Sequence, residues 1–494
     1  MKSSIPAIRI RAANSAPVNT RGDYVLYWMT AYRRLTWNFS LQRAVEWALE
    51  LDRALLILEA LRCGYEWASD RLHGFILQGV SEHMRRLRRR NILYYPYLEP
   101  VHDAGKGLLL TLAGRACLVV TDEFPAFFLP RMIDSASRSI PVLLEQVDSC
   151  GLLPLASPDR VFPSAHGFRR FLQKTLPAHL SAPPRADPLR GLRLRKPPPI
   201  PREITRRWPM AAAVLPGKEQ ALLSSLPIDH GVGPGKMRGG PLEAQHLWRL
   251  FLEKKLNLYP EKRNEPEQDA TSGLSPYLHF GHISSHQIFQ ELTRREGWTP
   301  ERLSPQAAGG RSGWWGLSPP AEAFLDELIT WRELGFNMCR YEGKYDRYET
   351  LPDWALETLE KHRKDRRAHR YTRDELERAA THDPLWNAAQ VQLVREGRIH
   401  NYLRMLWGKK ILEWSPTPRD ALEVMIRINN RYALDGRDPN SYSGIFWVLG
   451  RYDRPWGPER PIFGKIRYMS SENTARKMRV VDYIRKYSPT SSSL

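Results

Sequence analysis

Residues 381–414 read THDPLWNAAQVQLVREGRIHNYLRMLWGKKILEW, and residues 428–456 read INNRYALDGRDPNSYSGIFWVLGRYDRPW. Together they carry five tryptophans among arginines, asparagines and aspartates, a mixture that is unusual for a plain hydrophobic core. Trp407 and Trp414 are seven positions apart, so a helix would place them on one face, about 10 Å apart along its axis. That spacing suits redox-active indoles. We therefore predict a helical segment with electron-transfer or binding chemistry.

Helical patterns extend from this segment back to Glu243. They include AQHLWRLFLEKKL (244–256), HISSHQIFQELTRREG (282–297) and AEAFLDELITWRELGFNMCRYEG (321–343). Their apolar residues recur at the three- and four-residue intervals of an amphipathic helix, and strand-like alternation is scarce. The pattern predicts an all-α domain at residues 218–488.

The first third of the chain has a different pattern. Continuous apolar runs, which are typical of buried parallel strands, alternate there with helical patterns. We predict an α/β domain with a parallel, Rossmann-like sheet at residues 20–176, followed by a proline-rich extended linker at 177–217 whose arginines are solvated. The strand-like runs are DYVLYWM (23–29), ALLILEAL (54–61), ILYYPYLE (92–99) and ACLVVTD (116–122), and the helical patterns are LQRAVEWALELD (41–52) and HGFILQGVSEHMRRLRRR (73–90).

The overall charge favours a polyanionic partner. Lysine and arginine number 74 against 54 aspartates and glutamates, a net charge of +20 over 494 residues. This balance predicts binding to nucleic acid, although a basic surface that binds nothing has the same composition. The four cysteines lack the spacing of a zinc or iron-sulfur site, so we expect no metal and a reducing compartment.

We expect neither a membrane span nor a secretion signal in this chain. Its first residues, MKSSIPAIRIRAANS, lack a continuous apolar stretch, and no later run approaches the roughly 20 apolar residues that span a bilayer. A transit sequence and a simple tail both fit this arm, and we favour the tail. We expect a monomeric, soluble protein of the cytoplasm with access to DNA in a nucleoid or nucleus, and no membrane partner.

The tryptophan-rich segment and TSGLSPYLHFGHISSHQIF (271–289) resemble the photolyase/cryptochrome superfamily, most closely the class II cyclobutane pyrimidine dimer photolyases. The resemblance implies that the helical domain binds FAD and that residues 271–275 hold its diphosphate. A helix start with small hydroxyl groups is suited to that task, but an ordinary helix cap has the same pattern. The implied cofactor-binding residues are Tyr259, Thr271, Ser272, Gly273, Leu274, Ser275, Arg404, Asn429, Asp435 and Asp438.

Four of these residues would form the polar frame of the flavin ring. The resemblance implies that Arg404 pairs with Asp435, because a buried arginine and aspartate are costly apart and tolerable together. It places Asn429 near flavin N5, where an amide can donate or accept a hydrogen bond. Asp438 either contacts the ribityl or the N3 side of the flavin or simply forms a turn.

The resemblance also assigns the lesion site. Glu327 would hydrogen-bond the damaged bases, and its apolar neighbours Phe324, Leu328 and Trp331 predict a raised pKa. Trp331 and Trp447 would form two walls for a flipped pyrimidine dimer, because indoles stack on bases of any identity. Each of these two tryptophans taken alone could equally belong to the core.

Three tryptophans match a photoreduction relay, with Trp407 nearest FAD, Trp386 next and Trp414 as a weaker member. Pro416 and Pro418 end the helix after Trp414, which predicts that this end lies near solvent. We expect Trp456 to be a packing residue.

Further residues would contact DNA. Arg263 would lie on the DNA-facing rim, and the GRYDRPW stretch would supply a loop that enters the duplex, since arginine can both bind phosphate and stack. That loop contributes Arg451, Asp453 and Arg454. Two basic runs, MRRLRRR (84–90) and KHRKDRR (361–367), offer further contacts or are solvated helix faces.

The expected function is light-driven repair of cyclobutane pyrimidine dimers in DNA. A cryptochrome-like photoreceptor without repair activity and a flavin-free DNA-binding module are the alternatives. Residues 30–42, TAYRRLTWNFSLQ, depart from the QRDQRVEDN-like motif that class II relatives carry there. A deazaflavin antenna, a folate antenna and an empty antenna pocket therefore all remain open.

Overall fold

The computed structural model describes residues 3–211 and 219–488. The chain forms two compact units, which alternate along the sequence. The first unit comprises Met1–Pro158, Thr175–Trp248 and Leu274–Pro300, and the second comprises Asp159–Lys174, Arg249–Gly273 and Glu301–Leu494. The predicted domains at 20–176 and 218–488 were contiguous, and their boundaries stay a prediction. Residues 212–217 of the predicted linker lie outside the described residues.

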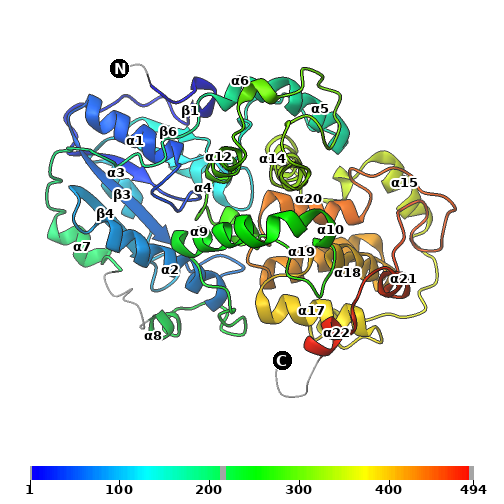
Figure 1. The fold of residues 1–494 in the computed structure, drawn as a ribbon. Helices are drawn as coiled ribbons and strands as arrows, with labels where there is room; N and C mark the ends of the chain where they lie inside the picture. The colour runs from blue at the N-terminus through cyan, green and yellow to red at the C-terminus, as the bar shows by residue number, and fades with distance from the viewer. Residues whose placement is uncertain (1–2, 212–218, 489–494) are drawn as a thin grey trace. The chain divides into compact units, whose positions relative to one another are not determined.

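The first unit is built on a six-stranded sheet with the order β1-β6-β5-β2-β3-β4 (Figure 1). All neighbouring strands pair in parallel except β1, which pairs antiparallel with β6 at one edge. The mostly parallel sheet predicted from the apolar runs is present, and the antiparallel edge strand is an addition to that prediction. The strands are β1 Ile10–Ala12, β2 Tyr24–Trp28, β3 Ala54–Leu61, β4 Ile92–Leu98, β5 Ala116–Asp122 and β6 Leu144–Val147.

Both faces of this sheet are covered. Alternate residues of a strand point to opposite faces. Val25 and Tyr27 of β2 belong to one apolar cluster, while Tyr24 and Leu26 belong to another. The continuous apolar runs follow from this double burial. The helices that belong wholly or mainly to this unit are α1 Phe39–Glu50, α2 Asp70–Leu87, α3 Leu108–Ala113, α4 Leu129–Ser137, α6 Pro177–Leu180, α7 Arg202–Arg207, α8 Glu219–Leu223, α9 Pro241–Leu250, α11 Ser275–His279 and α12 Ser285–Arg295.

The proline-rich linker is not wholly extended. Two short helices, α6 and α7, interrupt it between residues 177 and 211. Pro177 occupies the first turn of α6, where a proline has no hydrogen bond to lose. The prediction that proline excludes helix from this segment was therefore too strong.

The described part of the second unit contains no β-strand. Its helices are α5 Ala165–Thr175, α10 Tyr259–Lys262, α13 Pro319–Leu325, α14 Arg332–Tyr341, α15 Asp353–Lys361, α16 Arg373–Glu377, α17 Pro384–Glu396, α18 Asn401–Trp414, α19 Pro418–Tyr432, α20 Pro439–Val448, α21 Ser471–Lys477 and α22 Val481–Lys486. Two π-helical turns, η2 Phe251–Lys255 and η5 Asp326–Trp331, interrupt the α-helical geometry. The helical domain predicted from the periodicity is present.

Helices α14 and α20 are in close contact. A Cβ atom added to Gly335 of α14 would lie 2.8 Å from the Cα and N atoms of Asn440, at the start of α20. Only glycine allows the two backbones to approach so closely. This contact fixes α20, which carries Trp447, against α14, which directly follows the turn that carries Trp331.

Among the described residues, no helix combines the length and apolar character that a membrane crossing requires.

Candidate functional site

Glu327 lies in the π-helical turn between α13 and α14. Arg263, just after α10, donates a hydrogen bond of 2.8 Å from Nη1 to Glu327 Oε1. The Arg263 guanidinium also lies over the Tyr259 ring, 5.4 Å from its centroid. Isolated π-helical turns are frequent at functional sites, because the extra residue redirects side chains. The structure thus unites Tyr259, Arg263 and Glu327, which the sequence analysis assigned to three different roles.

An aromatic cluster supports this group. Tyr259 packs edge-on against Phe251 and Phe324, with both pairs of ring centroids 5.6 Å apart. Burial among these neighbours raises the pKa of Glu327, while the charge of Arg263 opposes that rise. The side chain of Glu327 is still 34% exposed, so solvent moderates both effects. The raised pKa agrees with the prediction, and its cause is burial.

Trp331 and Trp447 lie face to face. Their ring centroids are 4.6 Å apart and the ring planes diverge by only 15°. Trp331 comes from the end of the π-helical turn and Trp447 from α20, and both side chains are partly exposed. The two predicted walls are therefore neighbours, and each indole covers one face of the other.

Arg404 and Asp435 also lie together. Nη2 of Arg404 is 3.8 Å from Oδ2 of Asp435, and both side chains are largely buried. The Nε atom of Arg404 is buried and has no hydrogen-bond partner among the described residues. Since a buried donor without a partner is costly, this atom marks a place where a ligand with acceptor atoms would be stabilised.

Two further residues of the predicted flavin frame have partners within the protein. The buried Asn429 donates from Nδ2 to Gly436 O at 3.1 Å and to Ser441 Oγ at 2.8 Å. Asp438 is the N-cap of α20 and accepts a hydrogen bond of 2.9 Å from the Asn440 backbone N–H. This N-cap contact agrees with the turn-forming interpretation of Asp438, and its assignment to the flavin stays a prediction.

The predicted diphosphate loop, residues 271–275, leads into α11. Ser275 begins that helix and Pro276 stands in its first turn. Gly273 has a φ of +67°, which side chains disfavour, and a Cβ atom there would meet nothing within 4 Å. The loop is therefore open around Gly273. The loop contains the predicted residues Thr271, Ser272, Gly273, Leu274 and Ser275.

The three predicted relay tryptophans are in contact. Trp386 Nε1 donates to the Trp407 backbone oxygen at 3.0 Å, and Trp407 Nε1 donates to Gln390 Oε1 at 2.8 Å. The rings of Trp386 and Trp414 meet edge-on with centroids 5.3 Å apart. Asp383 caps α17 by accepting from the Trp386 backbone N–H, which fixes the start of the helix that carries this indole.

Trp414 itself is only 1% exposed, although Pro416, just beyond the end of its helix, is exposed. The two prolines do follow the end of the helix, but Tyr371 and His382 cover the indole. Their ring centroids lie 5.2 Å and 5.6 Å from that of Trp414. Sequence reasoning did not find this cover, because residues 371 and 414 are far apart along the chain.

The GRYDRPW loop divides between interior and surface. Arg451 is 6% exposed and donates from Nη1 to Thr350 O at 2.6 Å, so it braces the loop from within. Asp453 accepts hydrogen bonds from the Arg454 backbone N–H at 2.9 Å and from Trp456 Nε1 at 3.0 Å. Of the two arginines in this loop, Arg454 is the exposed one.

Trp456 is not a core residue, and its assignment to packing was wrong. It is 37% exposed. The guanidinium groups of Arg454 and Arg467 lie 5.0 Å and 5.2 Å from its ring centroid. A surface indole flanked by two arginines offers both a stacking face and positive charge, which is the combination that single-stranded nucleic acids bind.

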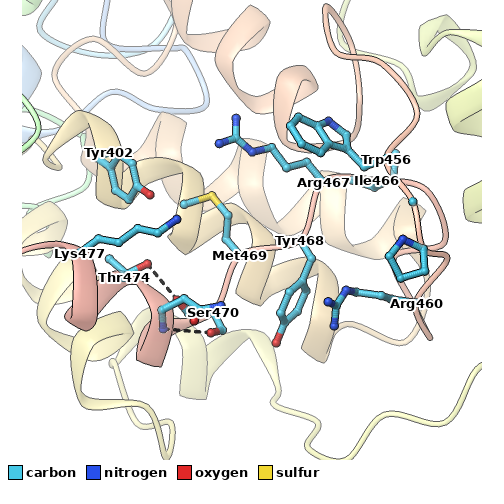
Figure 2. Close-up of a pocket in the computed structure, with 13 residues that line it drawn as sticks. Tyr402, Trp456, Arg460, Ile466, Arg467, Tyr468, Met469, Ser470, Thr474 and Lys477 are labelled. Atoms are coloured by element: carbon cyan, nitrogen blue, oxygen red, sulfur yellow. Dashed lines mark hydrogen bonds between the residues drawn. The ribbon is translucent and has the colours of Figure 1, made fainter.

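Trp456 also borders a pocket of about 310 Å³, which Figure 2 shows. Arg460, Arg467 and Lys477 line it, and Arg460 lies over the Tyr468 ring at 4.9 Å. The sequence signal for this pocket was the interleaving of basic and aromatic residues in ERPIFGKIRYM (459–469), which the sequence analysis passed over. The complete lining is Tyr402, Trp456, Gly457, Pro458, Arg460, Ile466, Arg467, Tyr468, Met469, Ser470, Asn473, Thr474 and Lys477.

Within the described residues, no cluster of three or more histidine, cysteine, aspartate or glutamate side chains is arranged to hold a metal ion. The four cysteines are buried and none is in a disulfide.

Comparison with known proteins gives a consistent result. No protein-family model matches the chain. Deoxyribodipyrimidine photo-lyase of Methanothermobacter thermautotrophicus is 35% identical over 97% of this chain and 98% of that protein. Proteins of the same name from Arabidopsis thaliana and Potorous tridactylus are 33% and 31% identical, covering 95% and 94% of this chain and 89% and 81% of their own. The structure of a class III photolyase from Agrobacterium tumefaciens superposes with a TM-score of 0.66 at 16% identity, covering 96% of this chain and 88% of that one.

Proposed function

The chain belongs to the photolyase/cryptochrome superfamily, and from this membership we propose that it repairs cyclobutane pyrimidine dimers in DNA by light-driven electron transfer. The single observation that carries the proposal is the near full-length similarity to proteins named deoxyribodipyrimidine photo-lyase. The arrangement of Glu327, Trp331 and Trp447 supports it.

FAD is the cofactor that fits the second unit. The buried Nε of Arg404 needs an acceptor, which the heteroatoms of a flavin ring offer, and Asp435 balances the arginine charge. Asn429 would lie on the N5 side and Asp438 at the ribityl side. Tyr259, Thr271, Ser272 and Gly273 complete the binding set within this unit, and the assignment of Leu274 and Ser275 stays a prediction. Bound, reduced and excited by light, FAD supplies the electron that opens the cyclobutane ring.

A bound lesion would replace the stacking contact between Trp331 and Trp447. Trp331 and Trp447 now cover one another, so an extruded pyrimidine dimer would replace that stacking with base–indole stacking on both sides. This replacement costs little free energy, because each indole stacks on a base instead of on the other indole. Unstacking of a damaged base pair also costs less than that of an intact one.

Glu327 would stabilise charge on the lesion. Its raised pKa favours the protonated carboxyl, which can donate a hydrogen bond to a pyrimidine carbonyl where negative charge develops. Arg263 holds the carboxyl in place through its 2.8 Å hydrogen bond and lies on the rim of the site. Both residues would thus act on the same lesion.

Trp407, Trp386 and Trp414 would form the photoreduction relay. Their direct contacts give an electron a continuous path of three indoles through the second unit. Each indole is almost fully buried, which protects a transient charge from side reactions with water.

A cationic and aromatic surface would hold the DNA. Arg454, Arg467 and Lys477 supply positive charge around Trp456, while Asp453 fixes the indole and Arg451 braces the loop. The net charge of +20 adds long-range attraction to a polyanion. We place the protein as a monomer in a compartment that contains DNA, and the antenna site stays open between a deazaflavin, a folate and an empty pocket.

The test is direct repair. The reduced, flavin-loaded protein is illuminated with a dimer-containing oligonucleotide, and the recovery of thymine absorbance is followed. Recovery is expected under blue or near-ultraviolet light and not in the dark. A parallel substrate with a pyrimidine 6-4 photoproduct tests the lesion class. Bound FAD without any recovery would reject repair and favour the photoreceptor alternative, whereas a colourless protein would favour the flavin-free DNA-binding module.

A further inference from the structure

Trp414, the outermost indole of the proposed relay, lies beneath two other rings. Tyr371, in the loop before α16, meets it edge-on at 5.2 Å between centroids, and His382 meets it at 5.6 Å. Tyr371 is partly exposed and His382 is exposed, whereas Trp414 is 1% exposed. The path from the relay to solvent therefore passes through these two residues.

The phenol of Tyr371 is held by His382 at two points. The His382 backbone N–H donates to the phenol oxygen at 3.1 Å, and that oxygen lies 2.5 Å from His382 Nδ1. Because the oxygen already accepts one hydrogen bond, the arrangement that satisfies both groups has the phenol O–H donating to Nδ1. The phenol proton is thereby directed at a ring nitrogen.

His382 is able to accept that proton. Partial desolvation lowers the pKa of His382 below its ordinary value, and His369, stacked on it with ring centroids 3.9 Å apart, adds to the effect. The imidazole is therefore neutral at pH 7, with Nδ1 as an acceptor. Lys410 also lowers the pKa, while Asp383 and Glu413 raise it. Since the ring is exposed, a proton that it accepts can leave to water.

We propose that Tyr371 is the terminal electron donor of the relay and that His382 Nδ1 takes its proton. The proposal rests on the relay function above, which supplies the oxidant as the Trp414 radical cation after light-driven oxidation. One electron passes from Tyr371 to Trp414 and the phenol O–H bond breaks. The products are a neutral Trp414, a neutral phenoxyl radical at Tyr371 and an imidazolium at His382.

Electrostatics favours this transfer. A positive charge on Trp414 would sit in a buried site, with the Lys410 ammonium already 5.6 Å from its ring centroid. The transfer moves that charge to His382 at the surface, where water solvates it. The positive charge thus ends on His382 at the surface, while the electron ends on the buried Trp414.

The test compares three variants with the unchanged, flavin-loaded protein by flash photolysis and electron paramagnetic resonance. The unchanged protein should show an indole radical that is replaced by a phenoxyl radical, more slowly in D₂O than in H₂O. Tyr371→Phe keeps the ring contact and should lose the phenoxyl signal, leaving a longer-lived indole radical. His382→Gln keeps an acceptor without basicity and should slow phenoxyl formation, because the phenol proton must then pass to water.

Tyr348→Phe is the matched control. The ring of Tyr348 packs against the Arg419 guanidinium. Loss of the Tyr348 hydroxyl should leave the indole and phenoxyl radical signals unchanged. A second measurement needs no flavin, since Tyr371→Phe should shift the nitrogen resonance of His382 Nδ1. Absence of any indole radical in all proteins would reject the relay itself. An indole radical that decays identically with and without the Tyr371 hydroxyl would reject this inference alone.

Discussion

Arg263 and Glu327 form the closest charged pair in the proposed lesion site. Burial raises the pKa of Glu327 and Arg263 lowers it, so Arg263→Gln should raise the pKa of Glu327 further. The neutral carboxyl would then persist to higher pH, and the repair yield should decline at a higher pH than in the unchanged protein. Carboxyl carbon resonances followed through a pH titration, beside the repair yield, check both expectations.

Glu327→Gln is the control for that titration, because it has no carboxyl to ionise. Its repair yield should be independent of pH through the window in which the unchanged protein loses activity. A decline at the same pH in Glu327→Gln would show that another group is responsible. A lower Glu327 pKa in Arg263→Gln would contradict the assigned electrostatics.

Trp407 is held at two points, because its backbone oxygen accepts from Trp386 Nε1 and its own Nε1 donates to Gln390 Oε1. Trp407→Phe should block photoreduction while leaving repair by the chemically reduced enzyme largely intact. The lost packing should cost about 1–3 kcal/mol, so the variant should still fold. Flavin absorbance under illumination with an external reductant measures the first effect, and the thymine assay measures the second.

Trp456→Phe is the matched variant outside the relay. It removes an indole of the same size at the surface, and photoreduction should be unchanged. Loss of repair as well as photoreduction in Trp407→Phe would contradict the role assigned to Trp407.

At the scale of elements, Lys409 joins α18 to α20. It is 1% exposed, and its Nζ donates to the backbone oxygen of Val448, the last residue of α20. A cation at a helix C-terminus is favourable. Burial nevertheless lowers the pKa of Lys409 to about 7, with Asp453 opposing and Arg467 assisting that shift. The Lys409 side chain thus links α18, which carries Trp407 and Trp414, to α20, which carries Trp447.

The sign of the pH dependence follows from this lowered pKa. Between about pH 7 and the unfolded value of 10.5, the unfolded chain binds more protons at Lys409 than the folded chain does, so the stability of the folded state rises with pH. Lys409→Met removes this contribution. The free energy of unfolding of the unchanged protein, measured by denaturant titration, should therefore rise relative to that of Lys409→Met from pH 7 to pH 10, by about a few kcal/mol at most.

Lys410→Met is the control on the same helix. Glu413 and Asp383 raise the pKa of Lys410, so its stabilising contribution is lost only as the pH rises through that higher pKa. The difference between Lys410→Met and the unchanged protein should stay constant between pH 7 and pH 10. If the stability of the unchanged protein fell relative to that of Lys409→Met between pH 7 and pH 10, the lowering of the Lys409 pKa by burial would be contradicted.

At the scale of the whole molecule, the excess of positive charge should govern DNA affinity. The logarithm of the association constant should fall linearly with the logarithm of salt concentration, because bound cations of the DNA are released. If Arg467 neutralises one phosphate, Arg467→Ala should reduce the magnitude of that slope by about 0.9. Fluorescence anisotropy of a labelled duplex over a salt series measures it.

Arg485→Ala is the control for the charge effect. Arg485 is 76% exposed on α22 and pairs with Asp482, and its removal should leave the slope nearly unchanged. An equal change of slope in both variants would mean that net charge, rather than the surface around Trp456, determines binding.

The sequence alone was sufficient where the signal is local and repeated. The apolar runs at 54–61 and 116–122 predicted buried parallel strands, because strands covered on both faces need apolar residues at every position. The three- and four-residue periodicity at 282–297 predicted α12, because an amphipathic helix buries one face and exposes the other. The short edge strand β1 was missed, since three residues carry too little pattern.

Composition and motif also determined part of the candidate site. The Arg404–Asp435 pair and the contacts among three relay tryptophans agree with the resemblance read from the sequence. Neither periodicity nor composition could predict the π-helical turn that carries Glu327, because one inserted residue leaves the helical pattern almost unchanged.

Only the tertiary structure decided which side chains are covered. Trp414 is buried although Pro416, just beyond its helix, is exposed, because Tyr371 and His382 return over the indole from other parts of the chain. Trp456 was expected to pack and is exposed between Arg454 and Arg467. Residue types and local spacing determine which elements form, whereas exposure and proton transfer depend on contacts between residues distant in sequence, which folding alone brings together.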